Sequence, residues 1–494
     1  MGISASAVAR VVGIDTVFKN LRGSSAALLP QRVAIVGQGS TAATYALTKL
    51  QITSAAQAGS VYGFGSPIHL AALQLLPVNG TGVGQIPVTV YPLDDDGAGV
   101  VASGDITPGG SPTSEASYIV RINNIDSEPF VVSVGDVVAD IVTAMTAVIN
   151  ASLNVPIIAA DDTTKVDFTS KWEGVSANDI VVEVVGSTTA GNTFGITQAA
   201  GGLNNPDVDT ALALVGNVWE TMFLNCMEVT DTTTLGRFTT FGEGRWGAEI
   251  RKPMIAFVGD VEASVTTSIA VPDARKTDRV NSQLVSPGSN DLPFVVAARQ
   301  LSRIAVEANE DPPSDYGSQP ATGLTPGSDS DQWTQTERDQ AVKAGSSTIE
   351  VRDSVVTISD VVTFYHPVGE EPPAYRYVVD IVKLMQVLYN LDLEFVSTEW
   401  DGAPLIPDGQ TTSNRSARTP SAAVAAVATI IDGLALAAII SDPKTAKSTI
   451  TAVIDSGNPK RLNIDFTIQL SGNANIIDIT NNFGFFFGTP SLVA

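Results

Sequence analysis

The sequence contains very few of the residues that carry most enzyme chemistry. Its 494 residues include one cysteine, Cys226, and two histidines, His69 and His366. A single cysteine excludes an intrachain disulfide, and two histidines are too few for a metal cluster or for most acid–base designs. The patterns Gly-x-Ser-x-Gly and Cys-x-x-Cys and the Walker phosphate loop are all missing. We therefore expect no catalytic residue, no metal and no cofactor, and we assign Cys226 and both histidines structural roles.

Positive charge is also scarce. Lysine and arginine number 28 against 52 aspartate and glutamate residues, which gives a formal net charge of −24. Neutralisation of phosphates by basic side chains supplies most of the affinity for nucleic acids, so this balance argues against a nucleic-acid-binding protein. Residues 94–209 hold 17 acidic and 3 basic residues, a net charge of −14, whereas residues 1–93 carry +4. Such a change of composition indicates a domain boundary near residue 93.

Only one apolar stretch is long enough to imitate a membrane span. Residues 422–440 read AAVAAVATIIDGLALAAII, with Asp432 and Gly433 at the middle. A carboxylate at that depth costs roughly 2.5–3.5 kcal/mol on membrane-insertion scales. Thr419 followed by Pro420 is a favourable helix start. We expect a buried helix that ends at Gly433, a second apolar segment after it, and no membrane insertion.

The stretch RVAIVGQGSTA, residues 32–42, matches the glycine pattern of a dinucleotide-binding domain. In such a domain the glycines follow a strand and open a helix whose N-terminus holds the pyrophosphate. An acidic residue about 20 positions later holds the ribose, but no aspartate or glutamate lies between Asp15 and Asp94. Residues 41–48 are also rich in threonine, a weak helix former. We interpret the motif as a strand followed by a glycine-rich turn, with NAD binding as the alternative.

Hydrophobic periodicity and capping patterns predict helices and strands in alternation. Ser54 and Thr334 each begin a capping-box pattern, and Ser66 precedes a proline suited to the first helical position. We expect strands at residues 32–36, 86–91, 117–122, 129–134, 165–171, 179–185, 253–259, 348–351, 355–358 and 461–470. We expect helices at residues 54–59, 67–76, 133–150, 210–225, 293–308 and 375–390.

These elements predict an α+β fold, with a mixed α/β core interrupted by a β-rich insertion. The concentrated negative charge of the insertion is easiest to place facing solvent, where repulsion is screened. The expected domains are an N-terminal arm at 1–30, the first part of the core at 31–92, the inserted domain at 93–207, the second part of the core at 208–471 and a C-terminal arm at 472–494.

Several segments, in their order along the chain, point to one protein family. They read LPQRVAIVGQG, ITSAAQAGSVYGFGSPIHLAAL, INNIDSEPFVVSVGDVVADI, INASLNVPIIAA, TQTERDQAVKAGSSTIEV and TFYHPVGEEPPAYRYVVDIVKLMQVLYNLDLEF. No single motif is diagnostic, but together they resemble the contractile tail sheath family of bacteriophages, in its Mu-like branch. The sequences of both terminal segments depart from this resemblance.

The resemblance implies a structural subunit of the virion tail, assembled in the host cytoplasm. Copies of the chain would form a helical array around a tail tube and contract on a trigger from the baseplate, to drive the tube through the host envelope. The implied partners are other copies of the chain, the tube protein, and the baseplate and tail terminator proteins. The alternatives are another virion structural protein, such as a tube, capsid or fibre subunit, and an NAD-binding enzyme.

The apolar residues of both terminal segments do not follow a helical period, so a helix would not bury them within their own subunit. An exposed apolar strand is an aggregation hazard, which disappears if each arm adds as a strand to a sheet of a neighbouring copy. The alternative is that the C-terminal segment folds back on its own subunit. The candidate arm residues are Val8, Val11, Val12, Val17, Phe18, Ile477, Ile479, Phe483, Phe485 and Phe487. The candidate receiving strand contains Leu462, Ile464, Phe466 and Ile468.

Two lysines form a candidate contact with the tube. Asp442 followed by Pro443 predicts a helix start, which places Lys444 and Lys447 on one face at i, i+3. They are rare bases in an acidic chain, and the sheath family is expected to grip its tube partly by charge. An ordinary solvated helix end is the alternative interpretation.

Overall fold

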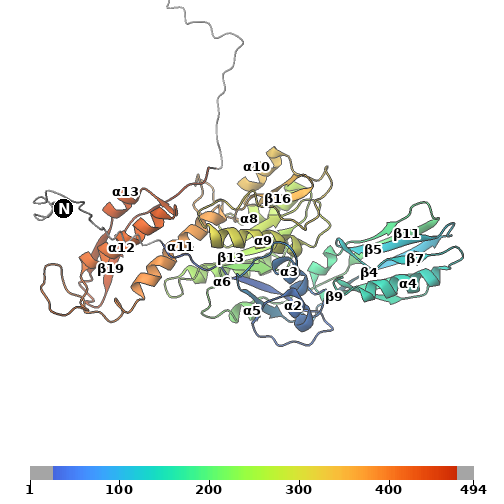
Figure 1. Cartoon of the computed structure of the whole chain (residues 1–494), viewed down its shortest axis with the longest axis horizontal. Helices are drawn as coiled ribbons and strands as arrows, with labels where there is room; N and C mark the ends of the chain where they lie inside the picture. The colour runs from blue at the N-terminus through green and yellow to red at the C-terminus, as the bar shows by residue number, and fades with distance from the viewer. Residues whose placement is uncertain (1–25, 475–494) are drawn as a thin grey trace, which may run out of the picture. The chain divides into compact units, whose positions relative to one another are not determined.

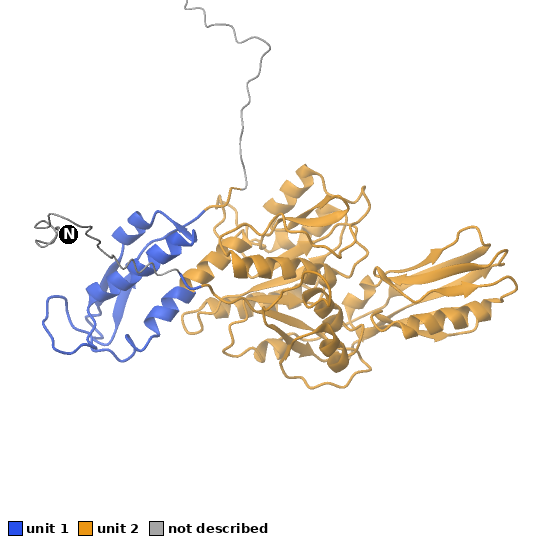
Figure 2. Cartoon of the chain, viewed as in Figure 1, with its two compact units in different colours: residues 1–27, 389–471 blue, residues 28–388, 472–494 orange. Residues whose placement is uncertain are grey.

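The computed structural model describes residues 26–474, and their contacts form two compact units (Figure 2). Of these residues, the larger unit contains 28–388 and 472–474, and the smaller unit contains 26–27 and 389–471. The segment expected as the second part of the core, residues 208–471, is thus divided after Leu388. Both units combine helices with sheets, so the mixed fold class predicted from the sequence is confirmed.

A six-stranded sheet lies at the centre of the larger unit (Figure 1). Its order is β14-β13-β12-β1-β3-β2, and all neighbours are parallel except β2 and β3. Every residue of the five parallel strands is buried, as expected when helices or other segments cover both faces of a sheet. The strands are β1 (Val33–Gln38), β2 (Leu50–Ile52), β3 (Val88–Leu93), β12 (Met222–Asn225), β13 (Ile255–Asp260) and β14 (Asn281–Val285).

Three helices of the larger unit begin where their capping residues predict, whereas α6, α7 and α8 were not predicted from the sequence. The side chains of Ser54, Ser66 and Thr334 accept backbone hydrogen bonds as N-caps, and Thr334 forms a complete capping box with Glu337. The long helix α9 packs on α3 and on strands β12, β13 and β14. The helices are α2 (Ala55–Tyr62), α3 (Pro67–Leu75), α5 (Asp209–Ala213), α6 (Thr232–Trp246), α7 (Val265–Ser268), α8 (Ala270–Ala274), α9 (Pro293–Glu310) and α10 (Gln335–Lys343). The boundary between the two units falls within α11 (Val378–Phe395).

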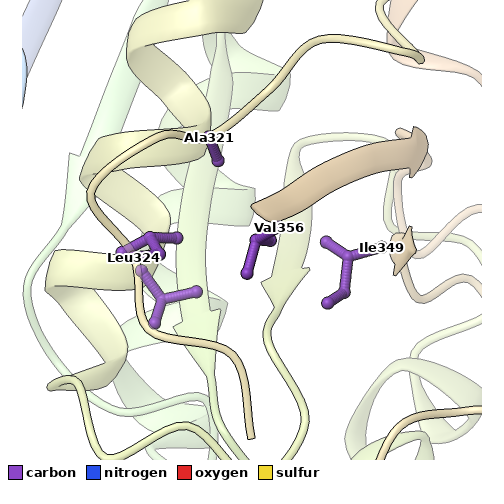
Figure 3. Close-up of a cluster of buried hydrophobic side chains, with 5 residues drawn as sticks. Ala321, Leu324, Ile349 and Val356 are labelled. Atoms are coloured by element: carbon purple, nitrogen blue, oxygen red, sulfur yellow. The ribbon is translucent and has the colours of Figure 1, made fainter. Parts of the chain in front are cut away.

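A hairpin of β15 (Thr348–Arg352) and β16 (Val355–Asp360) covers part of α9. Its two turn residues, Asp353 and Ser354, both have positive φ, which matches the right-handed twist of the flanking strands. The hairpin and the loop before it bury a small apolar cluster against the helix (Figure 3), formed by Val296, Ala321, Leu324, Ile349 and Val356.

Residues 101–200 hold two four-stranded sheets and one long helix (Figure 1). One sheet joins β10, β5, β6 and β7, and the other has the order β11-β4-β9-β8. The sequence predicts one apolar stripe on the long helix, formed by Val137, Val138, Ile141, Val142, Met145, Val148 and Ile149. Helix α4 (Val138–Ala151) buries Ile141, Val142, Met145 and Ile149 of this stripe, whereas Val137 precedes the helix and is exposed. The strands are β4 (Val101–Gly110), β5 (Ala116–Ile122), β6 (Ile125–Asp126), β7 (Phe130–Val132), β8 (Ile157–Asp161), β9 (Val166–Glu173), β10 (Val182–Gly186) and β11 (Asn192–Ala200). The outward placement of this region in an array stays a prediction.

The smaller unit contains two helices, the last turns of α11 and two sheets of two strands each. The antiparallel pairs are β17 with β20 and β18 with β19. Helix α12 packs on α13 and on β18. The elements are α12 (Pro420–Leu436), α13 (Pro443–Ser448), β17 (Ile440–Ser441), β18 (Thr451–Ile454), β19 (Leu462–Asp465) and β20 (Gln469–Leu470).

Three predicted elements were wrong in part. The helix predicted at 210–225 ends at Ala213, and its last residues form the buried strand β12, because Gly216 turns the chain at a φ of 57°. The helix predicted to end at Gly433 continues to Leu436 with that glycine buried inside it. The strand predicted at 461–470 is two short strands, because β19 and β20 pair with different partners.

Gly259 tests the contact between the central sheet and α9. A Cβ atom at this position would lie 1.7 Å from the carbonyl oxygen of Pro293, a backbone atom at the start of the helix. We expect Gly259→Ala to lower the free energy of unfolding by about 1–3 kcal/mol or more, since overpacking usually costs this much. Gly236→Ala on α6 is the matched control, since a Cβ there meets nothing within 4 Å. Equal thermal unfolding midpoints for the two variants would contradict this account.

Candidate functional surfaces

The glycine-rich turn after β1 is filled by a tyrosine side chain. The Gly39 N–H donates to the Tyr45 hydroxyl (3.0 Å), which itself donates to the carbonyl of Leu93 (2.8 Å). A Cβ at Gly39 would lie 2.3 Å from the Tyr45 ring, and burial raises the pKa of this tyrosine to about 12. Residues 41–48 form turns, with no helix after the glycines. The predicted strand and turn are confirmed, and the ring lies where a pyrophosphate would approach the glycines.

The same edge of the sheet is covered by the inserted region. The Gln38 amide at the end of β1 donates to Asp95 Oδ1 (2.6 Å) and to the carbonyl of Glu173 (2.8 Å). The Lys171 ammonium of β9 donates to the carbonyl of Phe64 (3.0 Å). Open α/β sheets usually bind ligands at the carboxyl ends of their strands. Here the chain's own insertion occupies much of that edge.

A turn between β5 and β6 supplies a second contact of the insertion with the core. Asn123 and Asn124 both have positive φ, a conformation that asparagine tolerates better than most residues. The Asn123 amide donates to the carbonyl of Asn290 (2.9 Å), and the Asn124 amide donates to Asp291 Oδ1 (3.0 Å). The insertion is therefore attached to the core at several points, by directional hydrogen bonds.

Three carboxyl groups lie near one another where the insertion meets the sheet. Asp179 comes from the inserted region, and Glu228 and Asp260 follow or end core strands; together they line a pocket of about 380 Å³. Burial, and then the neighbouring charges of Glu228 and Asp260, raise the pKa of Asp179 to about 7. Within residues 26–474, no group of three or more histidine, cysteine, aspartate or glutamate side chains is arranged to hold a metal ion. What these three residues show is an interaction of their charges, at the contact between the inserted region and the core.

The two histidines and the cysteine have structural contacts. His69 Nδ1 accepts from the Gly65 N–H (3.0 Å), and burial, followed by the charge of Lys171, lowers its pKa to about 4. His366 Nδ1 lies 2.7 Å from the carbonyl of Phe364. Cys226 is fully buried, and burial raises the pKa of its thiol. These contacts agree with the structural roles predicted from the sequence.

The candidate receiving strand is only partly a strand. Leu462 and Ile464 lie on β19, whereas Phe466 and Ile468 lie in the link to β20. Strand β19 pairs with β18, so within residues 26–474 one edge of each strand has no neighbouring strand. Such an edge presents backbone groups that an added strand can pair.

The candidate arm residues lie outside the described part of the chain. They are Val8, Val11, Val12, Val17 and Phe18 near the N-terminus, and Ile477, Ile479, Phe483, Phe485 and Phe487 near the C-terminus. Their role in linking subunits stays a prediction.

The two candidate tube-facing lysines lie on α13, whose start is the predicted one. The Asp442 side chain accepts from the Thr445 N–H (3.1 Å) as an N-cap. Lys447 Nζ lies 2.7 Å from Asp432 Oδ1 on α12, and Lys444 is exposed. The ion pair with Asp432 was not foreseen from the sequence, because the two residues are 15 positions apart. A tube contact through these lysines stays a prediction.

No helix in the described part of the chain combines the length and the apolar character that crossing a membrane requires.

A curated relative of this chain is the Mu-like prophage FluMu tail sheath protein of Haemophilus influenzae. The two are 23% identical over 427 residues, which cover 84% of this chain and 85% of the relative. No family model matches the chain. The relative confirms the resemblance to contractile tail sheath proteins of the Mu-like branch.

Two solved structures are also similar, both described as sheath tail proteins. The protein from Listeria innocua is 14% identical, covers 91% of this chain and 94% of its own, and has a TM-score of 0.49. The protein from Desulfitobacterium hafniense is 13% identical, covers 93% and 100%, and has a TM-score of 0.45. Since both scores are below 0.5, the assignment depends on the sequence relative.

The raised pKa of Asp179 predicts a pH dependence of stability. A carboxyl group whose folded-state pKa is raised stabilises the fold while protonated, and this stability is lost as pH rises from about 4 through about 7. We expect Asp179→Asn to remove that decline and, at pH 8, to raise the free energy of unfolding by up to about 4 kcal/mol. Denaturant unfolding at pH 4, 6 and 8 measures this. The exposed Glu115→Gln is the control, and parallel pH profiles for Asp179→Asn and the wild type would disprove the assignment.

Proposed function

We infer from its sequence relative that this chain is the structural subunit of a contractile tail sheath of the Mu-like branch. Copies polymerise as a helical array around a tail tube, and contraction of the array drives the tube through the host envelope. The observation that carries this proposal is a match to a tail sheath protein that extends over 84% of the chain. A match of that extent includes the core, the insertion and the region around α11.

The physics of such an array requires no catalytic residue. A head-to-tail contact between identical subunits that does not close into a ring generates a helical filament. If the extended array is kinetically trapped at a higher free energy than the contracted array, repacking of its interfaces supplies the work of contraction. The hydrogen bonds of Gln38, Asn123 and Asn124 to their partners support an insertion that moves with the core during this change.

Strand exchange through the terminal arms would keep the subunits joined. Among the described residues, one edge of each strand of the β18–β19 sheet has no neighbouring strand, so it offers backbone N–H and C=O groups to an arm of a neighbouring copy. The apolar residues of the arms, among them Phe483, Phe485 and Phe487, gain from leaving water, at roughly 1.5–3 kcal/mol for each ring that is fully buried.

The further partners follow from the same role. The sheath is a component of the virion, and its subunits contact the tube, the baseplate and the tail terminator after assembly in the host cytoplasm. Another virion structural protein is the second candidate, but the relative is a sheath protein. The filled turn at Gly39 argues against an NAD-binding enzyme.

Negative-stain electron microscopy of the purified protein tests the proposal. At high concentration we expect hollow, striated tubes, because the array is built from contacts between identical copies. Removal of residues 1–22 or of residues 473–494 should leave a folded protein that forms no tubes. Isolated particles from the intact chain would count against a sheath, and normal tubes from either truncation would refute the strand exchange.

Charge reversal tests the contact with the tube. We expect Lys444→Glu with Lys447→Glu to weaken co-assembly with the tube protein at least tenfold, with a larger effect at low salt because surface charges are screened by ions. The control is Lys343→Glu on α10, whose lysine forms an exposed pair within its own helix. Co-sedimentation measures binding, and circular dichroism checks the fold. Binding equal to that of the control would remove these lysines from the interface.

A further inference from the structure

The N-terminal arm enters the larger unit as an extended segment held by side-chain amides. The Leu29 N–H donates to Gln386 Oε1 of α11 (2.9 Å), and the Gln31 N–H donates to Asn309 Oδ1 at the end of α9 (3.1 Å). Leu29 is 3% exposed and Gln31 is 1% exposed. Alternate residues therefore turn inward, and their backbone groups are fixed before the chain begins β1.

Within the smaller unit the same segment has one more attachment. The Ala27 N–H donates to Asn390 Oδ1 (2.9 Å), and the Asn390 amide donates to the carbonyl of Ala27 (3.0 Å). This two-way pairing resembles that of two neighbouring strands, with a side chain in place of one backbone. Residues 27–31 are therefore bonded at every second position.

The C-terminal arm begins beside the same helix. The Lys383 ammonium donates to Asn473 Oδ1 (2.6 Å), and the Asn473 amide donates to the carbonyl of Pro313 (2.8 Å). Lys383 is 0% exposed, and Asp380 Oδ1 lies 3.1 Å from its nitrogen. A fully buried ammonium is costly unless it is paired and hydrogen-bonded. One of the bonds that satisfy it comes from the start of the C-terminal arm.

Lys383 and Gln386 are both buried, and they lie three residues apart on one face of α11. The other buried residues of α11 are apolar, namely Val378, Val379, Ile381, Val382, Met385 and Val387. An apolar residue at either position would pack without a desolvation cost. The two buried polar side chains instead bond to opposite ends of the chain.

We propose that one turn of α11 is the common anchor of both terminal arms, with Gln386 holding the start of the N-terminal arm and Lys383 the start of the C-terminal arm. Tension on one arm then passes to the other through this turn. The anchoring is a property of the single chain. Only the role in carrying tension rests on the proposed sheath function.

Two measurements on the intact chain test the anchoring. In Gln386→Leu the Leu29 N–H loses its acceptor, and we expect hydrogen exchange in a peptide covering residues 27–33 to become about tenfold faster. In Asn473→Ala, we expect acetylation of Lys383 by an amine-directed reagent to become at least about tenfold faster, since a buried ammonium loses a partner. Exposed Gln335→Leu and Asn154→Ala are the matched controls. Rates equal to those of the controls would overturn the anchor.

The role in tension is tested on assembled tubes under graded shear. Tubes of Gln386→Leu and of Asn473→Ala should break into shorter pieces than those of the control variants, with unchanged diameter. Shear resistance equal to that of the controls, despite the faster exchange and acetylation, would overturn the tension path. If the wild type forms no tubes, the proposed function fails, and the exchange and acetylation rates still decide the anchor. Asn473→Ala changes a partly exposed residue, so this test does not depend on a substitution in the core.

Discussion

The parallel pairing of β1 with β3 and β12 is the constraint on which the rest of the larger unit depends. Parallel strands cannot be joined by a tight turn, so the chain must leave the sheet and return by a crossover. Between β3 and β12 that excursion contains the whole insertion. Because the insertion leaves from the carboxyl end of β3, it lies next to the edge where a ligand would otherwise bind, and Gln38 bonds to it there.

This arrangement places two further sheets next to the carboxyl edge of the central parallel sheet. At the glycine turn, the Tyr45 hydroxyl accepts from the Gly39 N–H and donates to the carbonyl of Leu93, so it joins the turn to the end of β3. Near the termini, Lys383 and Gln386 are polar residues inside an apolar helix face. In both places polar side chains connect distant parts of the chain.

The sequence determined the local structure wherever the signal was local. The caps at Ser54, Ser66 and Thr334 depend on residues a few positions apart, and all three formed. The apolar stripe of α4 also depends on nearby residues, and four of its members are buried. The strand and the turn predicted at residues 32–42 also formed, because the apolar run and the glycines that specify them are adjacent in the sequence. The likeness to sheath proteins was also visible in the order of segments, since it is a property of the sequence itself.

Only the tertiary structure decided which distant residues meet. Residues 222–225 were placed in a helix because a short apolar run fits both structures, and pairing with β1 and β13 made it a strand. Residues 461–470 form two strands and not one, because β19 pairs with β18 and β20 pairs with β17. Leu29 bonds to Gln386 of α11, which lies 357 positions away, and Asn473 bonds to Lys383, which lies 90 positions away. No periodicity encodes such pairs, because they depend on how the packed elements bring the two ends of the chain to one helix.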